Sequence, residues 1–303
     1  MTPLSKPEIE ERHLIIDGRR VPRFFYGTAW KEDVTERLAG LALGLGFRAI
    51  DTANQRKHYF EAAVGAAVQK VLGNGMVKRD TIFVQTKFTY RRGQDDRLPY
   101  DPRVPIADQV RKSFASSLDH LGLDSVDFYV LHGPSLRDGL ADQDWEAWRA
   151  MEEVHANGGT RFLGVSNVSL EQVKLLCAQA KVPPRFVQNR CYASRGWDQG
   201  VRRFCKANNI AYQGFLLLTA NRGALQHPGL LAIAKRHGVP ATSVVFRFAL
   251  DVGMIALTGT SSPEHMKADL AVLKFRLDDD QVKTIEGLDY ADPKKVWIAV
   301  KKS

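Results

Sequence analysis

Apolar positions along the chain follow two alternating patterns. The first long stretch with helical spacing has apolar residues at Val34, Leu38, Leu41, Ala42 and Leu45. A short apolar run at residues 47–52 comes next and is typical of a buried strand. The same succession of helix and strand repeats toward the end of the chain. This alternation predicts an α/β protein with a parallel sheet.

The repeated pattern predicts a closed barrel. Strands are expected at residues 47–52, 81–88, 126–132, 161–167, 185–190, 210–215 and 254–260. Further helices are expected at residues 64–72, 110–121, 145–155, 170–181, 201–208, 230–237 and 241–250. With a first strand near the N-terminus, these units fit a (β/α)8 barrel, the TIM-barrel fold, in a chain of 303 residues. A doubly wound open sheet in two domains is the alternative. No linker rich in Pro, Gly or Ser divides the chain, so we predict one domain over residues 1–303.

A β-hairpin is predicted ahead of the barrel. The apolar residues 14–16 are followed by Asp17-Gly18 and then by a second apolar run at residues 21–26. Asp-Gly between two apolar runs is a strong sign of a two-residue hairpin turn. The end of the second run, at Gly27 and Thr28, also serves as the end of the first barrel strand.

Charge and composition exclude several classes of protein. The net charge is +9, but the basic residues are spread along the chain and are not interleaved with aromatic residues, so no nucleic-acid partner is predicted. A positive field equally attracts a phosphate-bearing cofactor or an anionic substrate. No apolar run approaches the roughly 20 residues that span a bilayer, and the polar N-terminus does not resemble a secretory signal.

The three cysteines are Cys177, Cys191 and Cys205. They are too few and too far apart for a disulfide framework or a CxxC metal site, and we expect them to pack as small apolar residues. The sequence therefore predicts a cytoplasmic protein without a metal site.

A glycine motif near the first helix imitates a dinucleotide fingerprint. Residues 44–49 match GxGxxA. The Rossmann fingerprint follows a strand and opens a helix, whereas these glycines close a helix and precede a strand. We interpret them as a helix C-cap.

Ionisable residues stand at the ends of three predicted strands. Asp51, Lys87 and His132 each follow a run of apolar residues. TIM-barrel enzymes place their catalytic residues at this end of the strands. A lysine inside an apolar strand is costly unless it is paired, and Asp51 is its obvious partner. Three ionisable groups at one level of a barrel favour a site over isolated core residues.

Several motifs stand in order along the chain: Gly46-Phe47-Arg48-Ala49-Ile50-Asp51-Thr52-Ala53, Glu61, Val64-Gly65, Val84-Gln85-Thr86-Lys87, Asp127-Phe128-Tyr129-Val130-Leu131-His132, Gly164-Val165-Ser166-Asn167, Gln188 and Ala211-Tyr212. Together they resemble the aldo-keto reductase superfamily, and the resemblance covers nearly the whole chain. It implies a barrel that reduces an aldehyde or ketone to an alcohol by hydride transfer from NADP(H), or from NAD(H). A non-catalytic NADP(H)-binding sensor on the same barrel is the alternative.

The resemblance also implies a catalytic tetrad of Asp, Tyr, Lys and His. Asp51, Lys87 and His132 match it directly. In the family, Lys paired with Asp tunes Tyr, and His donates a hydrogen bond to the substrate carbonyl. Family members that reduce carbon–carbon double bonds have Glu in place of this His, so His132 implies a carbonyl substrate.

The catalytic tyrosine does not align cleanly. The segment from Asp51 to Glu61 is two residues longer than is usual in the family. We predict Tyr59 as the proton donor, with its pKa lowered by Lys87. His58, which stands three residues before Glu61, is the alternative donor.

The family's cofactor contacts carry over to a larger set of residues. Ser166, Asn167 and Gln188 match those that hold the nicotinamide carboxamide, and Tyr212 matches the aromatic residue that stacks on the nicotinamide ring. The complete set is Gly27, Thr28, Asp51, Ser166, Asn167, Gln188, Tyr212, Phe215, Gly259, Thr260, Ser261, His265 and Asp269.

The segment that binds the 2′-phosphate of NADP in the family departs from the pattern. Gly259, Thr260 and His265 stand where the family often has Lys, Ser and Arg, and Asp269 replaces an Asn that contacts adenine. Two fixed cations are missing, and a charge-assisted contact contributes about 1.5–3 kcal/mol. We therefore expect weakened NADPH binding or acceptance of NADH.

The substrate pocket is predicted to be open. The tail at residues 289–303 is short, and Gly133 stands where the family commonly has Trp. The irregular stretch at residues 89–105 is expected to cover part of the site. The partner implied is a small carbonyl compound, and the family default is a monomer.

Overall fold

The computed structural model describes residues 12–288. Eight parallel strands close into a barrel in the order β10-β3-β4-β5-β6-β7-β8-β9. Their bounds are β3 (Phe24–Gly27), β4 (Ala49–Asp51), β5 (Phe83–Phe88), β6 (Val126–Leu131), β7 (Thr160–Ser166), β8 (Phe186–Arg190), β9 (Ala211–Phe215) and β10 (Ile255–Thr258). The predicted (β/α)8 fold is confirmed.

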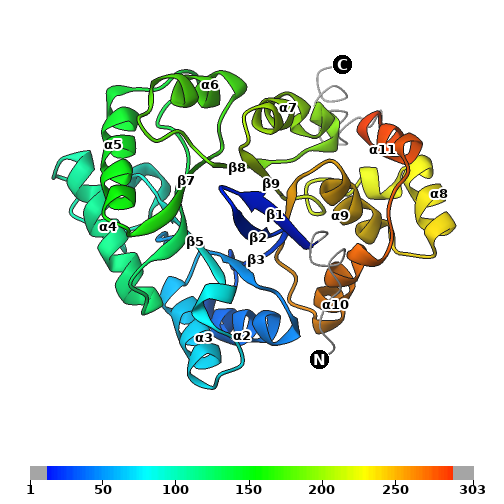
Figure 1. Ribbon diagram of the computed structural model, residues 1–303, viewed down its shortest axis with the longest axis horizontal. Coiled ribbons are helices and arrows are strands. Elements are labelled where there is room, and N and C mark those ends of the chain that lie inside the picture. The colour runs from blue at the N-terminus through cyan, green and yellow to red at the C-terminus, as the bar shows by residue number, and fades with distance from the viewer. Residues whose placement is uncertain (1–11, 289–303) are drawn as a thin grey trace, which may run out of the picture.

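Helices surround the barrel (Figure 1). They are α2 (Thr35–Leu45), α3 (Glu61–Gly73), α4 (Ile106–Leu121), α5 (Asp142–Ala156), α6 (Leu170–Gln179), α7 (Gln199–Ala207), α8 (Pro228–His237), α9 (Ala241–Asp251), α10 (Pro263–Ala271) and α11 (Asp279–Glu286). Within residues 12–288, none of these helices combines the length and the apolar character needed to cross a membrane.

Side chains fill the barrel in two layers. The layer at the N-terminal end of the strands is apolar and consists largely of aromatic rings: Phe25, Phe83, Phe128, Phe162 and Phe186. The next layer is polar and buried, and holds Asp51, Gln85, Lys87, Gln188 and Gln213. A second apolar cluster packs between the strands and the helices. The polar layer faces the end of the barrel at which the strands finish, where catalysis is expected.

The predicted hairpin is present and covers the opposite end of the barrel. β1 (His13–Ile16) pairs with β2 (Arg19–Pro22) in antiparallel register, with Asp17 and Gly18 at positive φ in the turn. Figure 1 shows the two strands lying across the barrel. Ile16 and Val21 pack into the apolar layer below the polar one. The hairpin therefore closes the N-terminal end of the barrel.

The prediction of a single strand over the apolar run at residues 21–26 is wrong. The run is divided at Arg23 between β2 and β3. β2 pairs antiparallel with β1, whereas β3 pairs parallel with β4 and β10. Pro22 has no N–H to donate to a sheet ladder, which suits it to a strand end. The chain changes its pairing partners there.

Two further predictions hold. Gly46 ends α2 at a φ of +117°, and the Phe47 N–H donates to the Ala42 carbonyl at 3.0 Å. The GxGxxA match is thus a helix C-cap, as predicted. Cys191 and Cys205 are buried and Cys177 is half-buried, and all three are free thiols.

Candidate active site

Three of the predicted catalytic residues project from neighbouring strand ends. Asp51 ends β4, Lys87 lies in β5, and His132 directly follows β6. The Lys87 ammonium donates to Asp51 Oδ1 at 2.5 Å and to the Thr52 carbonyl at 2.8 Å. Tyr59 comes from the loop between β4 and α3, and its ring centroid lies 4.9 Å from Lys87 Nζ and 6.1 Å from the His132 ring. All four predicted residues therefore meet at one place.

The ion pair between Lys87 and Asp51 is removed from water. The two side chains are 0% and 3% exposed. Asp51 Oδ1 also accepts from the amide of Gln85 at 2.6 Å and from that of Gln188 at 3.0 Å. A buried carboxylate is tolerated when it is paired and hydrogen-bonded in this way. Burial lowers the pKa of Lys87, and the nearby Asp51 carboxylate opposes that shift.

The lengthened loop places Tyr59 and not His58 beside Lys87. The loop forms a tight turn in which the amides of His58 and Tyr59 both donate to the Gln55 carbonyl, at 3.0 and 2.9 Å. The His58 ring instead packs against Trp30, with centroids 4.0 Å apart and the ring planes tilted by 39°, and its Nδ1 is hydrogen-bonded to Gln55 Oε1. This turn directs the His58 side chain toward Trp30, in the loop after β3.

The expectation that Lys87 lowers the pKa of Tyr59 is not met. Burial raises the pKa of the phenol well above 10, and the negative charge of Asp51 raises it further. The charge of Lys87 is largely neutralised by Asp51 at 2.5 Å, which explains why its effect on the phenol is small. Tyr59 is consequently a neutral phenol that can donate a proton.

His132 is held in place by two neighbours. Its Nδ1 is hydrogen-bonded to the Thr89 hydroxyl at 2.7 Å, and its carbonyl accepts from the Asn167 amide at 2.9 Å. Burial lowers the pKa of His132 well below 6.5, and the positive charges of Lys87 and Arg190 lower it further. The imidazole is therefore neutral at physiological pH and carries one N–H.

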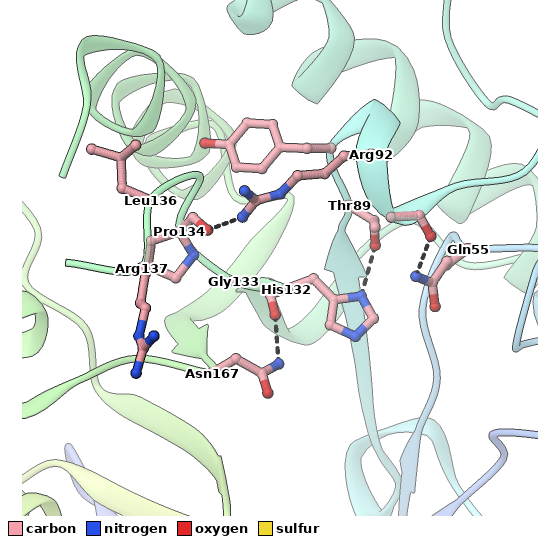
Figure 2. Close-up of a pocket in the computed structure, with 11 residues that line it drawn as sticks. Gln55, Thr89, Arg92, His132, Gly133, Pro134, Leu136, Arg137 and Asn167 are labelled. Atoms are coloured by element: carbon pink, nitrogen blue, oxygen red, sulfur yellow. Dashed lines mark hydrogen bonds between the residues drawn. The ribbon is translucent and has the colours of Figure 1, made fainter. Parts of the chain in front are cut away.

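A pocket of about 410 Å³ opens above His132 (Figure 2). Its walls come from the loops after β4, β5, β6 and β7, and consist of Gln55, Thr89, Tyr90, Arg92, Gly93, His132, Gly133, Pro134, Leu136, Arg137 and Asn167. The stretch at residues 89–105 supplies four of these positions, as expected of a loop that borders the site. The tail at residues 289–303 lies outside the described residues.

The predicted nicotinamide contacts are arranged at two depths. Ser166 and Asn167 lie at the end of β7, where the Asn167 amide donates to the Ser166 hydroxyl at 3.1 Å. Gln188 lies deeper, and its amide donates to Asp51 Oδ1 at 3.0 Å and to Gln213 Oε1 at 2.5 Å. Phe215 ends β9 and is only half-buried, with the Arg190 guanidinium 5.9 Å from its ring centroid.

Tyr212 does not face the barrel mouth, contrary to the prediction. It pairs in register with Val187, and both belong to the cluster between strands and helices. Its phenol donates to Asp198 at 2.8 Å. Side chains alternate between the two faces of a strand, so Gln213 and Phe215 share the inner face and Tyr212 points outward. Phe215 is the aromatic residue that β9 offers to a ring at the mouth.

The predicted phosphate contacts lie in the loop after β10 and at the start of α10. Ser261 and His265 are exposed, and Thr260 is half-buried. The Lys31 ammonium, from the loop after β3, donates to the Gly259 carbonyl. Gly259 stands where the family often has a lysine, so another loop brings a cation to the same place. Lys31 was not singled out from the sequence, although its position shortly after the end of β3 places it at the end of the barrel where the site is expected.

The remaining predicted contacts are buried. Thr28 donates to the Asp51 carbonyl through its amide at 3.0 Å and its hydroxyl at 2.9 Å. A Cβ added to Gly27 would lie 3.3 Å from the Thr258 carbonyl oxygen, which is close packing between β3 and β10. Asp269 is buried in α10 and accepts from the Thr258 hydroxyl at 2.7 Å. Gly27, Thr28 and Asp269 thus support the mouth from beneath.

The comparison with known proteins agrees with this geometry. The family model for the aldo/keto reductase family matches residues 26–290. The chain belongs to the aldo-keto reductase family. Among curated relatives, the prostaglandin-E(2) 9-reductase of Oryctolagus cuniculus is 27% identical over 92% of this chain and 91% of its own. An aldo-keto reductase of Mycobacterium marinum is 30% identical over 90% of this chain and 89% of its own.

Solved structures of the family have the same fold. An aldo-keto reductase of the silkworm, Bombyx mori, is 26% identical to this aldo-keto reductase and superposes with a TM-score of 0.78, covering 91% of this chain and 87% of that one. A crystal structure complexed with NADPH is 25% identical, with the same TM-score and coverage. The protein is an NAD(P)H-dependent oxidoreductase that reduces carbonyl compounds.

Proposed function

We propose that Tyr59 is the proton donor of this reductase and that His132 orients the substrate carbonyl. The observation that carries the proposal is the single cluster formed by Tyr59, His132 and the buried pair of Lys87 and Asp51. Each member has a distinct state: a neutral phenol, a neutral imidazole and a paired ammonium. Reductase names among the relatives favour this enzyme over a non-catalytic sensor.

The residues at the mouth fit a phosphate-bearing nicotinamide cofactor. Phe215 presents a half-buried ring, and Ser166 and Asn167 offer a hydroxyl and an amide for a carboxamide. Lys31 supplies a cation, and Thr260 supplies a hydroxyl close to the start of α10. Helix N-termini favour anionic groups. When bound, the cofactor supplies the hydride that reduces the carbonyl carbon.

The chain's own residues handle the proton and the developing charge. The carbonyl oxygen accepts a hydrogen bond from His132, and Tyr59 gives its proton to the alkoxide oxygen as charge builds there. Lys87 lies 4.9 Å from the centroid of the Tyr59 ring, where its charge offsets that of Asp51 as the phenolate forms. Asp51 keeps Lys87 charged in spite of burial, because the carboxylate favours the ammonium form.

Thr89 is hydrogen-bonded to Nδ1 of His132, so it bears on which nitrogen of the imidazole carries the proton. A neutral imidazole has one N–H and one acceptor nitrogen. If the Thr89 hydroxyl donates to Nδ1, the proton resides on Nε2. Figure 2 shows the second ring nitrogen of His132 turned away from Thr89. In that tautomer the imidazole donates to a substrate oxygen in the pocket.

Substitution of Tyr59 tests the assignment. Tyr59→Phe removes the acidic hydroxyl and keeps the ring, so we expect a fall in kcat of about 100-fold or more, the usual contribution of a general acid. NADPH binding, followed by fluorescence titration, is expected to remain. The matched control is His58→Gln, which removes the neighbouring titratable ring and is expected to retain most of the activity. The reverse result would assign the proton to His58.

We further propose that the protein acts as a cytoplasmic monomer with no nucleic-acid partner. The barrel is sealed at its N-terminal end by its own hairpin, and the three free cysteines suit a reducing compartment. The pocket is built from loops of one chain. The expected effect of the missing phosphate cations on the preference for NADPH over NADH stays a prediction, and Lys31 opposes it.

A further inference from the structure

The pocket above His132 has a marked excess of positive charge. Among the described residues that line it, two are arginines, Arg92 and Arg137, and none is a carboxylate. The lining is otherwise neutral. A volume of about 410 Å³ suits a small molecule.

Arg137 provides a cation with no partner of its own. It lies in the loop between β6 and α5, five positions beyond His132, and its side chain is exposed. Within residues 12–288 it makes neither an ion pair nor a hydrogen bond. Five residues of extended chain reach at most roughly 18 Å. Arg137 and His132 line the same pocket, so one small molecule in it can contact both side chains.

Arg92 adds a second charge and shapes the loop. Its guanidinium donates to the carbonyl of Pro134 (Figure 2) and to that of Ser135, and both residues lie just before Arg137 in the same loop. Both acceptors are neutral, so the positive charge is not cancelled. Asp144 lies behind Ser135 and accepts from its amide and hydroxyl, each at 2.7 Å. That carboxylate is buried and does not line the pocket.

The electrostatic setting of His132 agrees with this picture. The charged groups that perturb its imidazole are Lys87, His58 and Arg190, and each lowers its pKa as a positive charge does. No carboxylate opposes them among the described groups that act on this ring. Arg190 ends β8 and contributes positive charge at the mouth in addition to the two arginines of the pocket.

We propose that the carbonyl substrate of this reductase carries an anionic oxygen group, a carboxylate or a phosphate, which Arg137 binds while His132 holds the carbonyl. The proposal rests on the proposed function, because it places the carbonyl at His132. Arg137 is unpaired and exposed, so binding an anion breaks no existing ion pair. Arg92 holds the loop and adds long-range attraction.

A matched pair of substrates tests the charge directly. The anion is para-formylbenzoate and the neutral compound is its methyl ester, which has the same aldehyde on the same ring. We expect kcat/KM to favour the anion, and the preference to shrink with added salt because ionic attraction is screened. A phosphorylated sugar aldehyde and its unphosphorylated parent form a second pair, which distinguishes phosphate from carboxylate.

Substitution then identifies the residue. In Arg137→Gln we expect kcat/KM for the anion to fall about tenfold or more, the size of a charge-assisted contact, and to fall far less for the ester. Arg137→Lys is expected to restore part of the preference. Arg203→Gln, which removes an exposed arginine on α7, is the matched control for the change in net charge and is expected to leave both rates unchanged.

The outcomes separate this proposal from the proposed function. Turnover of the esters and parent aldehydes with no preference for either anion, or an equal loss for both members of a pair in Arg137→Gln, overturns the anionic substrate and leaves the carbonyl reductase intact. Failure to reduce any aldehyde contradicts the proposed function, and the present proposal with it.

Discussion

Thr89 illustrates how a single hydroxyl can govern a catalytic group. It lies one residue beyond β5 and 2.7 Å from His132 Nδ1. The hydroxyl can both donate and accept, whereas an aliphatic side chain of the same shape can do neither. The orientation of the His132 ring therefore depends on a residue that makes no contact with the reacting carbonyl in the proposed mechanism.

Removal of the Thr89 hydroxyl is expected to slow the reaction. Thr89→Val keeps the shape and loses the hydrogen bond, which is worth about 1 kcal/mol, so we expect kcat to fall about fivefold to tenfold. Thr89→Ser restores the hydroxyl and should recover most of the rate. Steady-state kinetics with a neutral aldehyde give the comparison. A valine variant as fast as the serine variant would show that Thr89 only fills space.

Asp269 makes a pH-dependent contribution to stability. Burial raises its pKa to about 6, while the bond from Thr258 and the charge of His265 oppose the rise. The unfolded value is near 3.8, so the folded state binds the proton more tightly. Stability from this group is fully present below pH 3.8 and is lost as the pH rises through about 6. The ionised carboxylate is therefore a cost at neutral pH.

Asp269→Asn removes that cost. The amide oxygen can still accept from Thr258, and no charge is buried. We expect the variant to be more stable than the parent by about 1–3 kcal/mol at pH 8, with the difference shrinking as the pH is lowered. Urea denaturation at pH 8 and at pH 4.5 measures it. A difference that is constant with pH would show that Asp269 does not titrate in this range.

At the scale of elements, α3 and α4 approach each other through Gly65. A Cβ built on Gly65 would lie 2.0 Å from the His120 carbonyl oxygen and 2.8 Å from Leu121 Cα, and both are backbone atoms of α4. Neither atom can move without the helix. α3 begins at Glu61, directly after the loop that carries Tyr59, so this contact also anchors the catalytic loop.

Gly65→Ala is expected to force the two helices apart. Overpacking of this kind usually costs about 1–3 kcal/mol. A Cβ added to Gly73, in the last turn of the same helix, would have no atom within 4 Å, so Gly73→Ala serves as the control. In a helix Ala is favoured over Gly by about 1 kcal/mol, which should leave the control as stable as the parent or more so. Thermal unfolding compares them, and equal midpoints for both variants would contradict the packing argument.

At the scale of the whole molecule, the barrel was predictable because apolar runs mark most of its strands and helical spacing fills the stretches between them. Asp51, Lys87 and His132 were predictable for a related reason, since a polar residue at the end of such a run stands out. The outward direction of the Tyr212 side chain was not predictable. A shift of one residue along a strand moves a side chain to the other face of the sheet, and an aromatic residue fits either face. Lys31 and Arg137 lie on loops, whose course depends on contacts that the sequence pattern does not show.

The hairpin at the base of the barrel bears on how molecules come and go. With β1 and β2 packed over the N-terminal end and an aromatic layer above them, the polar centre is reached from one side only. Every molecule that binds there must therefore enter and leave through the same opening. The molecule that binds deepest has to bind first and dissociate last, so the depth of each binding position determines the order of binding. The hairpin that closes the N-terminal end thereby determines the order in which molecules bind at the opposite end of the barrel.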